Sequence, residues 1–201
     1  MSGRLVLATR NAHKLAELRR ILDEAGLRVE LVGVDAFSGV ADVAETGTTF
    51  AENALLKAHA TAQATGLPAV ADDSGLCVDV LGGMPGVFSA RWSGQHGADR
   101  ANLELVLAQI ADLPDERRSA YFACAAAIAF PDGTERVAEG FLRGALLRAP
   151  RGTGGFGYDP IFLPAGGDLT TAELDPAEKD AISHRGQAFR ALADELAALP
   201  L

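Results

Sequence analysis

The stretch that most constrains the fold is Val70-Ala-Asp-Asp-Ser-Gly75, where apolar residues lead into two adjacent carboxylates, a hydroxyl and a glycine. We expect a short buried strand over residues 67–71 that ends at Asp72 and Asp73. Because side chains alternate between the faces of a strand, one aspartate should face a ligand crevice and the other should cap a turn or orient its neighbour. Acidic residues at such an edge suit a metal. An ordinary strand-to-turn exit is the alternative, since Asp, Ser and Gly are common turn residues.

Composition limits the class of protein. The chain has 201 residues, 48% hydrophobic and 22% charged, which is ordinary for a globular protein with a real core. We expect a single domain over residues 1–201. No apolar run is long enough to span a bilayer, and the N-terminus lacks a signal-peptide pattern, so a cytoplasmic protein is expected. A formal net charge of −9 opposes sequence-independent binding to nucleic acid.

Hydrophobic periodicity predicts further strands and helices. Strands are expected over residues 5–8, 27–34, 76–80 and 120–130, with a hairpin turn at 131–133 and an antiparallel return over 136–142. Helices are expected over about 12–25, 49–65 and 98–111, from the N-cap Asp175, and after the cap Ser183. Cys77 and Cys124 lie in apolar runs, which indicates buried free thiols.

The first predicted strand and helix form an arrangement that suits phosphate. Asn11 is expected to cap the helix, which puts Lys14 in the first turn, where a cation is unfavourable for the helix dipole. A lysine there is better explained if an anion binds at the helix end. A simple strand–helix turn with a solvated Lys14 is the alternative.

A second group of polar residues surrounds the start of the next helix. Thr49-x-x-Glu52 is a capping box. Asn53 and Lys57 are four residues apart and share a helix face. With Glu45 from the preceding loop, they would converge where this helix meets the aspartate-bearing strand. A solvated surface charge is the usual alternative for such a lysine.

The segment Gly152-Thr-Gly-Gly-Phe-Gly157 matches G-x-G-x-x-G, a pattern typical of dinucleotide-binding loops. We reject that interpretation because Pro160 should push Asp159 towards an extended conformation where the motif needs a helix. A loop that grips a flat ring is favoured instead: an aromatic would stack on a base, and Asp159 would accept from ring N–H groups. A flexible loop with core aromatics is the alternative.

Two potential cations, His184 and Arg185, fall in the first turn of the last helix. They are unfavourable for the helix alone and therefore suggest a nearby acceptor or anion. A single histidine is more often structural than catalytic, but the adjacent arginine favours ligand binding.

Taken in order, these segments closely resemble the inosine/xanthosine triphosphate pyrophosphatases, which remove deaminated purine nucleotides. The resemblance rests on Leu7-Ala-Thr-x-Asn-x-x-Lys14, Glu45-Thr-Gly-x-Thr-Phe-x-Glu-Asn53 with Lys57, Ala71-Asp-Asp-Ser-Gly75, Pro85-Gly-x-x-Ser-Ala-Arg91, Gly154-Gly-Phe-Gly-Tyr-Asp-Pro160, and Glu178-Lys179 followed by Ser183-His-Arg-Gly186. It covers nearly the whole chain. Arg10 is a departure, because it stands where the family often has glycine.

The resemblance implies an elongated α/β fold with a long twisted mixed β-sheet flanked by helices, two lobes with a nucleotide cleft between them, and a homodimer. It also implies Mg2+ and the cleavage of ITP, dITP or XTP to the monophosphate and pyrophosphate. Glu45 and Asp73 would hold the metal, and Asp73 would be the general base. The residues that would bind the substrate are Thr9, Arg10, Asn11, Ala12, His13, Lys14, Asn53, Lys57, Ser74, Phe156, Gly157, Tyr158, Asp159, Lys179, His184 and Arg185.

The chemistry of the substrate agrees with these roles. Magnesium typically binds one or two carboxylates together with phosphates, which fits Glu45 and Asp73, and Asp72 is expected to support them. Donors from His184 and Arg185 would favour the O6 acceptor of hypoxanthine or xanthine, whereas adenine would leave them unpaired. Two alternatives remain: a nucleotide sensor without catalysis, and the same reaction on a different base.

Overall fold

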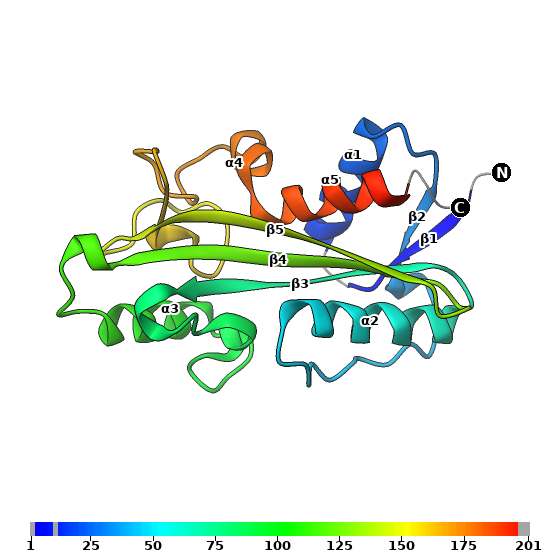
Figure 1. Ribbon diagram of the computed structural model, residues 1–201, viewed down its shortest axis with the longest axis horizontal. Helices are drawn as coiled ribbons and strands as arrows, with labels where there is room; N and C mark the ends of the chain where they lie inside the picture. The colour runs from blue at the N-terminus through cyan, green and yellow to red at the C-terminus, as the bar shows by residue number, and fades with distance from the viewer. Residues whose placement is uncertain (1–2, 10–11, 197–201) are drawn as a thin grey trace. The chain divides into compact units, whose positions relative to one another are not determined.

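The structure is a computed structural model that describes residues 3–9 and 12–196. The chain divides into two compact units. Figure 1 draws the helices and strands of both units, coloured by residue number. The first comprises Met1–Asp73, Cys124–Gly140 and His184–Leu201, and the second comprises Ser74–Ala123 and Phe141–Ser183.

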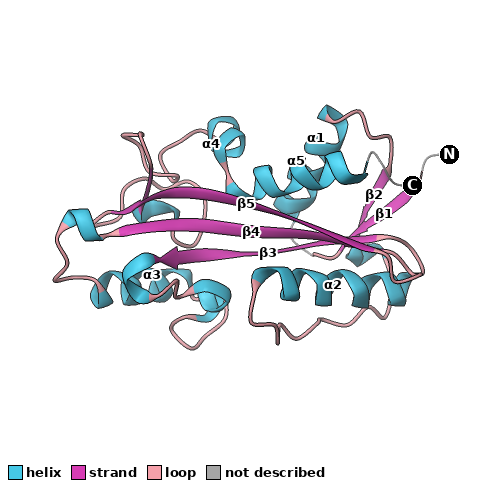
Figure 2. Cartoon of the chain, in the orientation of Figure 1, coloured by secondary structure: helices cyan, strands magenta, loops and turns pink. Residues whose placement is uncertain are grey.

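The strands of the described residues form one mixed sheet in the order β2-β1-β3-β4-β5-β6 (Figure 2). Its strands are β1 (Arg4–Leu7), β2 (Glu30–Gly33), β3 (Ala69–Val78), β4 (Ser119–Ala129), β5 (Glu135–Leu146) and β6 (Phe162–Pro164). The helices are α1 (Ala12–Glu24), α2 (Phe50–Thr65), α3 (Asp99–Gln109), α4 (Pro176–Ile182) and α5 (His184–Leu196). Strand β1 pairs in parallel with β2 and β3, whereas β5 and β6 are antiparallel. The predicted mixed α/β sheet with flanking helices is therefore confirmed.

Strand β3 corrects the sequence prediction. A strand ending at Asp72 and Asp73 and a separate strand over 76–80 were expected, but one strand runs from Ala69 to Val78. Both aspartates therefore lie in mid-strand. The glycine that suggested a turn is present for another reason: a Cβ on Gly75 would lie 2.3 Å from Ser89 Oγ. Gly75 allows a second segment to approach the strand closely.

Two other predictions of local structure need correction. Strand β2 begins at Glu30 and ends at Gly33, where a 3-10 helix over Val34–Ala36 follows, so the strand is shorter than the predicted 27–34. Asp159 is not extended, because a short 3-10 helix spans Asp159–Ile161 with Pro160 inside it. The remaining predicted helices agree with the structure to within a few residues.

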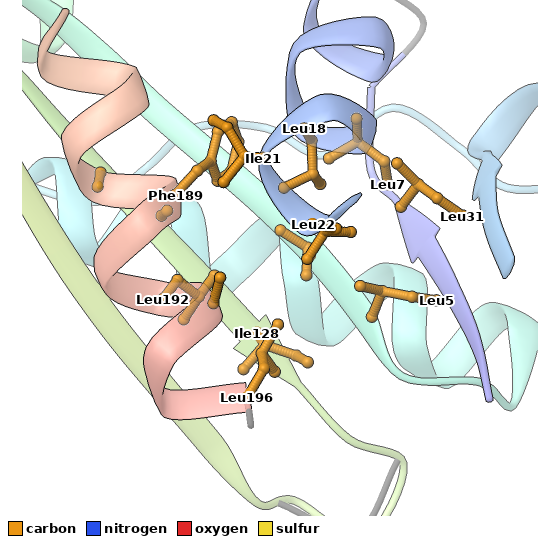
Figure 3. Packing of buried hydrophobic residues seen from close by; sticks show 14 of the residues in the cluster. Leu5, Leu7, Leu18, Ile21, Leu22, Leu31, Ile128, Phe189, Leu192 and Leu196 are labelled. Carbon is orange, nitrogen blue, oxygen red and sulfur yellow. The ribbon is translucent and has the colours of Figure 1, made fainter. Parts of the chain in front are cut away.

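The first unit packs two apolar layers against its strands. Residues of β4 alternate: Cys124, Ala126 and Ile128 join one cluster, and the alanines between and after them join the other. The first cluster packs α1 and α5 through leucines and Phe189, as Figure 3 shows. The second cluster packs the small residues of α2. Figure 1 shows α1 and α5 on one side of these strands and α2 on the other.

The second unit has a core of its own. Leu103 and Val106 of α3, and Ile110 just after it, belong to a buried cluster with β3, β4 and β6 side chains. This is the periodicity that predicted the helix. Cys77 and Cys124 are buried and free, as predicted. None of the described helices has the length and apolar character needed to cross a bilayer.

Candidate active site

One face of β3 gathers two carboxylates around a lysine. Asp73 Oδ2 accepts a hydrogen bond of 3.0 Å from Asn53 Nδ2, and Asp73 Oδ1 lies 3.5 Å from Lys57 Nζ. Lys57 Nζ also donates to Glu45 Oε1 at 2.7 Å. The predicted convergence of Glu45, Asn53 and Lys57 at the aspartate strand is therefore confirmed. The two acidic side chains contact the same ammonium group.

Local contacts fix the helix that supplies two of these residues. Thr49 Oγ1 accepts from Glu52 N at 3.1 Å and Glu52 Oε2 accepts from Thr49 N at 3.2 Å, so the predicted capping box is present. Asn53 Oδ1 accepts from Gly47 N at 2.8 Å. A Cβ on Gly47 would lie 2.7 Å from that oxygen and also 2.7 Å from Glu52 Cβ, so a larger residue there would force the start of the helix to shift. The bond directs the Asn53 amide NH2 towards β3.

The electrostatics of this group favour an added cation. Burial raises the pKa of the Asp73 carboxyl, and Glu45 raises it further, although Lys57 and Asn53 oppose them. Burial alone would lower the pKa of Lys57, but Asp73 and Glu45 outweigh that effect and raise it. The carboxylates of Glu45 and Asp73 thus share one ammonium group, that of Lys57, in a partly buried site. Such a site has the oxygen ligands and the net charge that suit a hard divalent ion.

The opposite face of β3 holds a second cluster of charged groups. Lys14 Nζ lies 2.9 Å from Asp72 Oδ1 and 2.8 Å from Asp72 Oδ2, and Arg185 Nε donates to Oδ2 at 3.2 Å. Burial alone would raise the pKa of Asp72, but Lys14 and Arg185 hold it well below the ordinary value. Asp72 and Asp73 thus contact different cations, and the expectation that one faces a ligand crevice while the other caps a turn or orients its neighbour stays a prediction. The expected acceptor near Lys14 and Arg185 is Asp72 itself.

A glycine that the sequence analysis overlooked positions the start of α5. A Cβ on Gly140 of β5 would lie 2.1 Å from the carbonyl oxygen of His184 and 2.6 Å from Ala188 N. Only glycine lets the first turn of α5, which carries Arg185, approach the strand this closely. A glycine inside a strand pattern was the available signal.

The segment 9–14, predicted to bind phosphate, is described in part. Arg10–Asn11 lie outside the described residues, and so does the predicted cap at Asn11. Ala12–His13 begin α1, but their side chains are also outside the described part. Thr9 is half-buried just after β1.

In the second unit, Asp159 contacts the glycine-rich loop over residues 152–157. Its Oδ2 accepts from Phe156 N at 2.8 Å and contacts Lys179 Nζ at 2.5 Å, while Oδ1 accepts from Thr171 Oγ1 at 2.8 Å. Lys179 Nζ also lies 5.5 Å from the centre of the Phe156 ring, which is 58% exposed. Gly155 has φ +69°, and a Cβ there would lie 2.1 Å from Asp159 Oδ2. Thr171 was not predicted, since no motif marks it.

The two aromatic side chains of this loop differ in their environment. Tyr158 is buried, and its hydroxyl donates to Ser89 O at 2.9 Å, so it belongs to the core. Gly157 N donates to Asp99 Oδ2 at 3.1 Å. Phe156 is thus the exposed ring of the loop. Ser74, also predicted to bind substrate, is half-buried in β3.

Comparison with known proteins decides the family. The family model described as Ham1 family matches residues 5–195. The chain belongs to the Ham1 family. A dITP/XTP pyrophosphatase of Streptomyces coelicolor is 71% identical over 189 residues, which cover 94% of each chain. The resemblance inferred from the motifs is therefore confirmed.

Solved structures of Ham1 relatives share the fold. A HAM1 protein from Coxiella burnetii is 43% identical, with a TM-score of 0.90 over 98% of this chain and 100% of that one. A nucleoside-triphosphatase / dITP/XTP pyrophosphatase from Mycobacterium abscessus is 54% identical, with a TM-score of 0.80 over 98% and 100% of the two chains.

Proposed function

We propose that this Ham1 family member hydrolyses ITP, dITP and XTP to the monophosphate and pyrophosphate, and so removes deaminated purines from the nucleotide pool. The observation that carries the proposal is the pair Glu45 and Asp73 held on one ammonium group, Lys57. The name of the 71% identical relative, dITP/XTP pyrophosphatase, supports the reaction. We expect a cytoplasmic homodimer on the strength of the family resemblance.

Glu45 and Asp73 would hold magnesium. Their carboxylate oxygens are the ligands that magnesium prefers, and two of them match the count it takes beside substrate phosphates. When bound, the ion would offset negative charge that develops on the phosphate oxygens.

Asp73 would act as the general base. It would accept a proton from the water whose oxygen bonds to the α-phosphorus, while the bond from that phosphorus to the bridging oxygen breaks and pyrophosphate leaves. Burial raises the pKa of Asp73, which makes its carboxylate a better base than an exposed aspartate. Lys57 and Lys14, from opposite faces of β3, would neutralise phosphate charge.

The base would be read by the exposed Phe156 ring, with Lys179, His184 and Arg185 as donors. Asp159 supports this loop, because both of its carboxylate oxygens are engaged by Phe156, Lys179 and Thr171. Its predicted role as an acceptor for ring N–H groups would compete with those bonds. Donors aimed at O6 would discriminate against adenine.

The test is to incubate the protein and Mg2+ with ITP, dITP, XTP, GTP and ATP and to identify the products. We expect pyrophosphate and the monophosphate from the first three, with little turnover of GTP and ATP. Release of orthophosphate in place of pyrophosphate would rule out the proposed bond. Binding of ITP without turnover would favour the sensor alternative.

Lys57→Met should bind Mg2+ more tightly, although it binds ITP more weakly. The ammonium contacts both proposed metal ligands, so its loss removes a competing positive charge. A net change of roughly 1.4 kcal/mol, tenfold in affinity, is expected once screening has reduced the Coulomb energy. The measurement is calorimetric titration of Mg2+ without nucleotide, at pH 8 so that Asp73 stays ionised.

Lys14→Met is the matched control for this experiment. Lys14 contacts Asp72 on the other face of β3, so its removal should leave Mg2+ affinity within a factor of two or so of the wild type. Weaker Mg2+ binding in Lys57→Met than in Lys14→Met would show that the lysine supports the metal site and does not compete with it.

A further inference from the structure

We infer that Asp72 is a positioning residue that sets two substrate-binding cations at once, Lys14 for the phosphates and Arg185 for the base. The inference rests on the proposed function, because that function assigns the two cations to different parts of one nucleotide. Asp72 itself would not contact the substrate.

The geometry joins three distant parts of the chain at one carboxylate. Lys14 of α1 and Arg185 of α5 are 58 and 113 residues away from Asp72 in sequence. Lys14 Nζ contacts both carboxylate oxygens, at 2.9 and 2.8 Å, and Arg185 Nε shares Oδ2 at 3.2 Å. The side chains of Asp72 and Arg185 are only 1% and 10% exposed, so water screens this cluster weakly.

Asp72 contacts each of the two cations through defined atoms. Arg185 donates to Asp72 through Nε, the guanidinium nitrogen bonded to the aliphatic part of the side chain. An ammonium group has three donors, and the carboxylate of Asp72 engages Lys14 through two oxygens. Asp72 therefore fixes the direction of each cation.

Charge explains why a carboxylate is needed at this position. Two cations bonded to the same buried group would repel each other if the group were neutral, and each would move or become more mobile. An asparagine at this position keeps the size and one oxygen but loses the charge. Asp72→Asn should thus weaken binding of both the phosphate end and the base end of the nucleotide. Loss of one cation should weaken binding of only one end.

The experiment uses two probes that report on the two ends separately. Pyrophosphate, titrated by calorimetry, reports on the phosphate end, and inosine, titrated by ligand-observed NMR, reports on the base end. We expect Asp72→Asn to weaken both about tenfold, Lys14→Met to weaken pyrophosphate alone, and Arg185→Met to weaken inosine alone. Glu30→Gln, which breaks the exposed ion pair with Arg4, is the control and should change neither.

A merely structural role would lower thermal stability and leave the probe affinities of the folded protein unchanged, and that result would overturn the inference. A loss confined to one probe would also overturn it. If Asp72→Asn does not fold, Asp72→Glu keeps the charge but must displace both cations, and unchanged affinities for both probes would then be decisive against the inference. Failure of the wild type to release pyrophosphate from ITP would instead contradict the proposed reaction. The probe titrations do not depend on that result.

Discussion

Asp73→Asn should lower kcat for ITP about 1,000-fold. Asparagine keeps the shape and one oxygen of the side chain, but it cannot accept the proton from the attacking water, and a positioned base typically contributes a factor of roughly 100 to 10,000. It would also be a poorer ligand for magnesium. Initial rates of pyrophosphate release at saturating ITP and Mg2+ are the measurement.

Glu45→Gln separates the two roles given to Asp73. If Glu45 only binds the metal, its loss should be largely repaired by raising Mg2+, because a weaker site is then refilled. Asp73→Asn should not be repaired in this way, since no concentration of metal restores a proton acceptor. Asp112→Asn, at an exposed position of the second unit, should leave the rate unchanged. Repair of Asp73→Asn by Mg2+ would remove the general base from the mechanism.

Asp73→Asn should leave the free energy of unfolding unchanged or raise it. Burial raises the pKa of Asp73 in the folded protein, so the folded state binds a proton more readily than the unfolded state does. The ionised carboxylate therefore costs stability at neutral pH. Any gain in the melting temperature of Asp73→Asn should shrink as the pH falls from above the raised pKa of the folded protein towards the ordinary aspartate pKa of about 3.9, and it should vanish below that value, where both states are protonated.

Local sequence signals predicted much of this molecule because their causes are local. Thr49 and Glu52 cap each other across three residues, and the alternation of Asp72 and Asp73 follows from the pleat of any strand. The segments matching the pyrophosphatases lie in family order, which indicated the family before any geometry was known. These features depend on neighbours in sequence, or on many weak matches together.

What could not be predicted depends on contacts between distant segments. Gly75 suggested a turn, and one long strand was therefore predicted as two. A glycine stands there because Ser89, fourteen residues later, approaches the strand closely. The shared partner of Lys14 and Arg185 could not be seen either, because Asp72 meets them only after folding. Gly140 was passed over for the same reason: its neighbour is the start of α5.

Arg118→Met should lower the free energy of unfolding by about 3 kcal/mol. The side chain is 2% exposed and has carbonyl oxygens as its hydrogen-bond partners: Nε donates to Leu146 at 2.9 Å, Nη1 to Ile110 at 2.7 Å and Nη2 to Leu147 at 2.8 Å. Bonds from a charged donor are worth roughly 1.5–3 kcal/mol each but are not additive. Relief of the buried charge offsets part of the loss, since burial lowers the pKa of Arg118.

Arg148→Met is a close control, because Arg148 also donates to carbonyl oxygens, those of Ala111 and Leu113, yet its side chain is 56% exposed. Water can replace its bonds, so the change should be within about 1 kcal/mol. Arg118→Lys should fall between the two, since one ammonium group cannot match three acceptors placed for a planar guanidinium. Denaturant unfolding of the three variants measures these differences. Equal stability of Arg118→Met and Arg148→Met would mean that the segments ending α3 and β5 do not depend on the buried guanidinium.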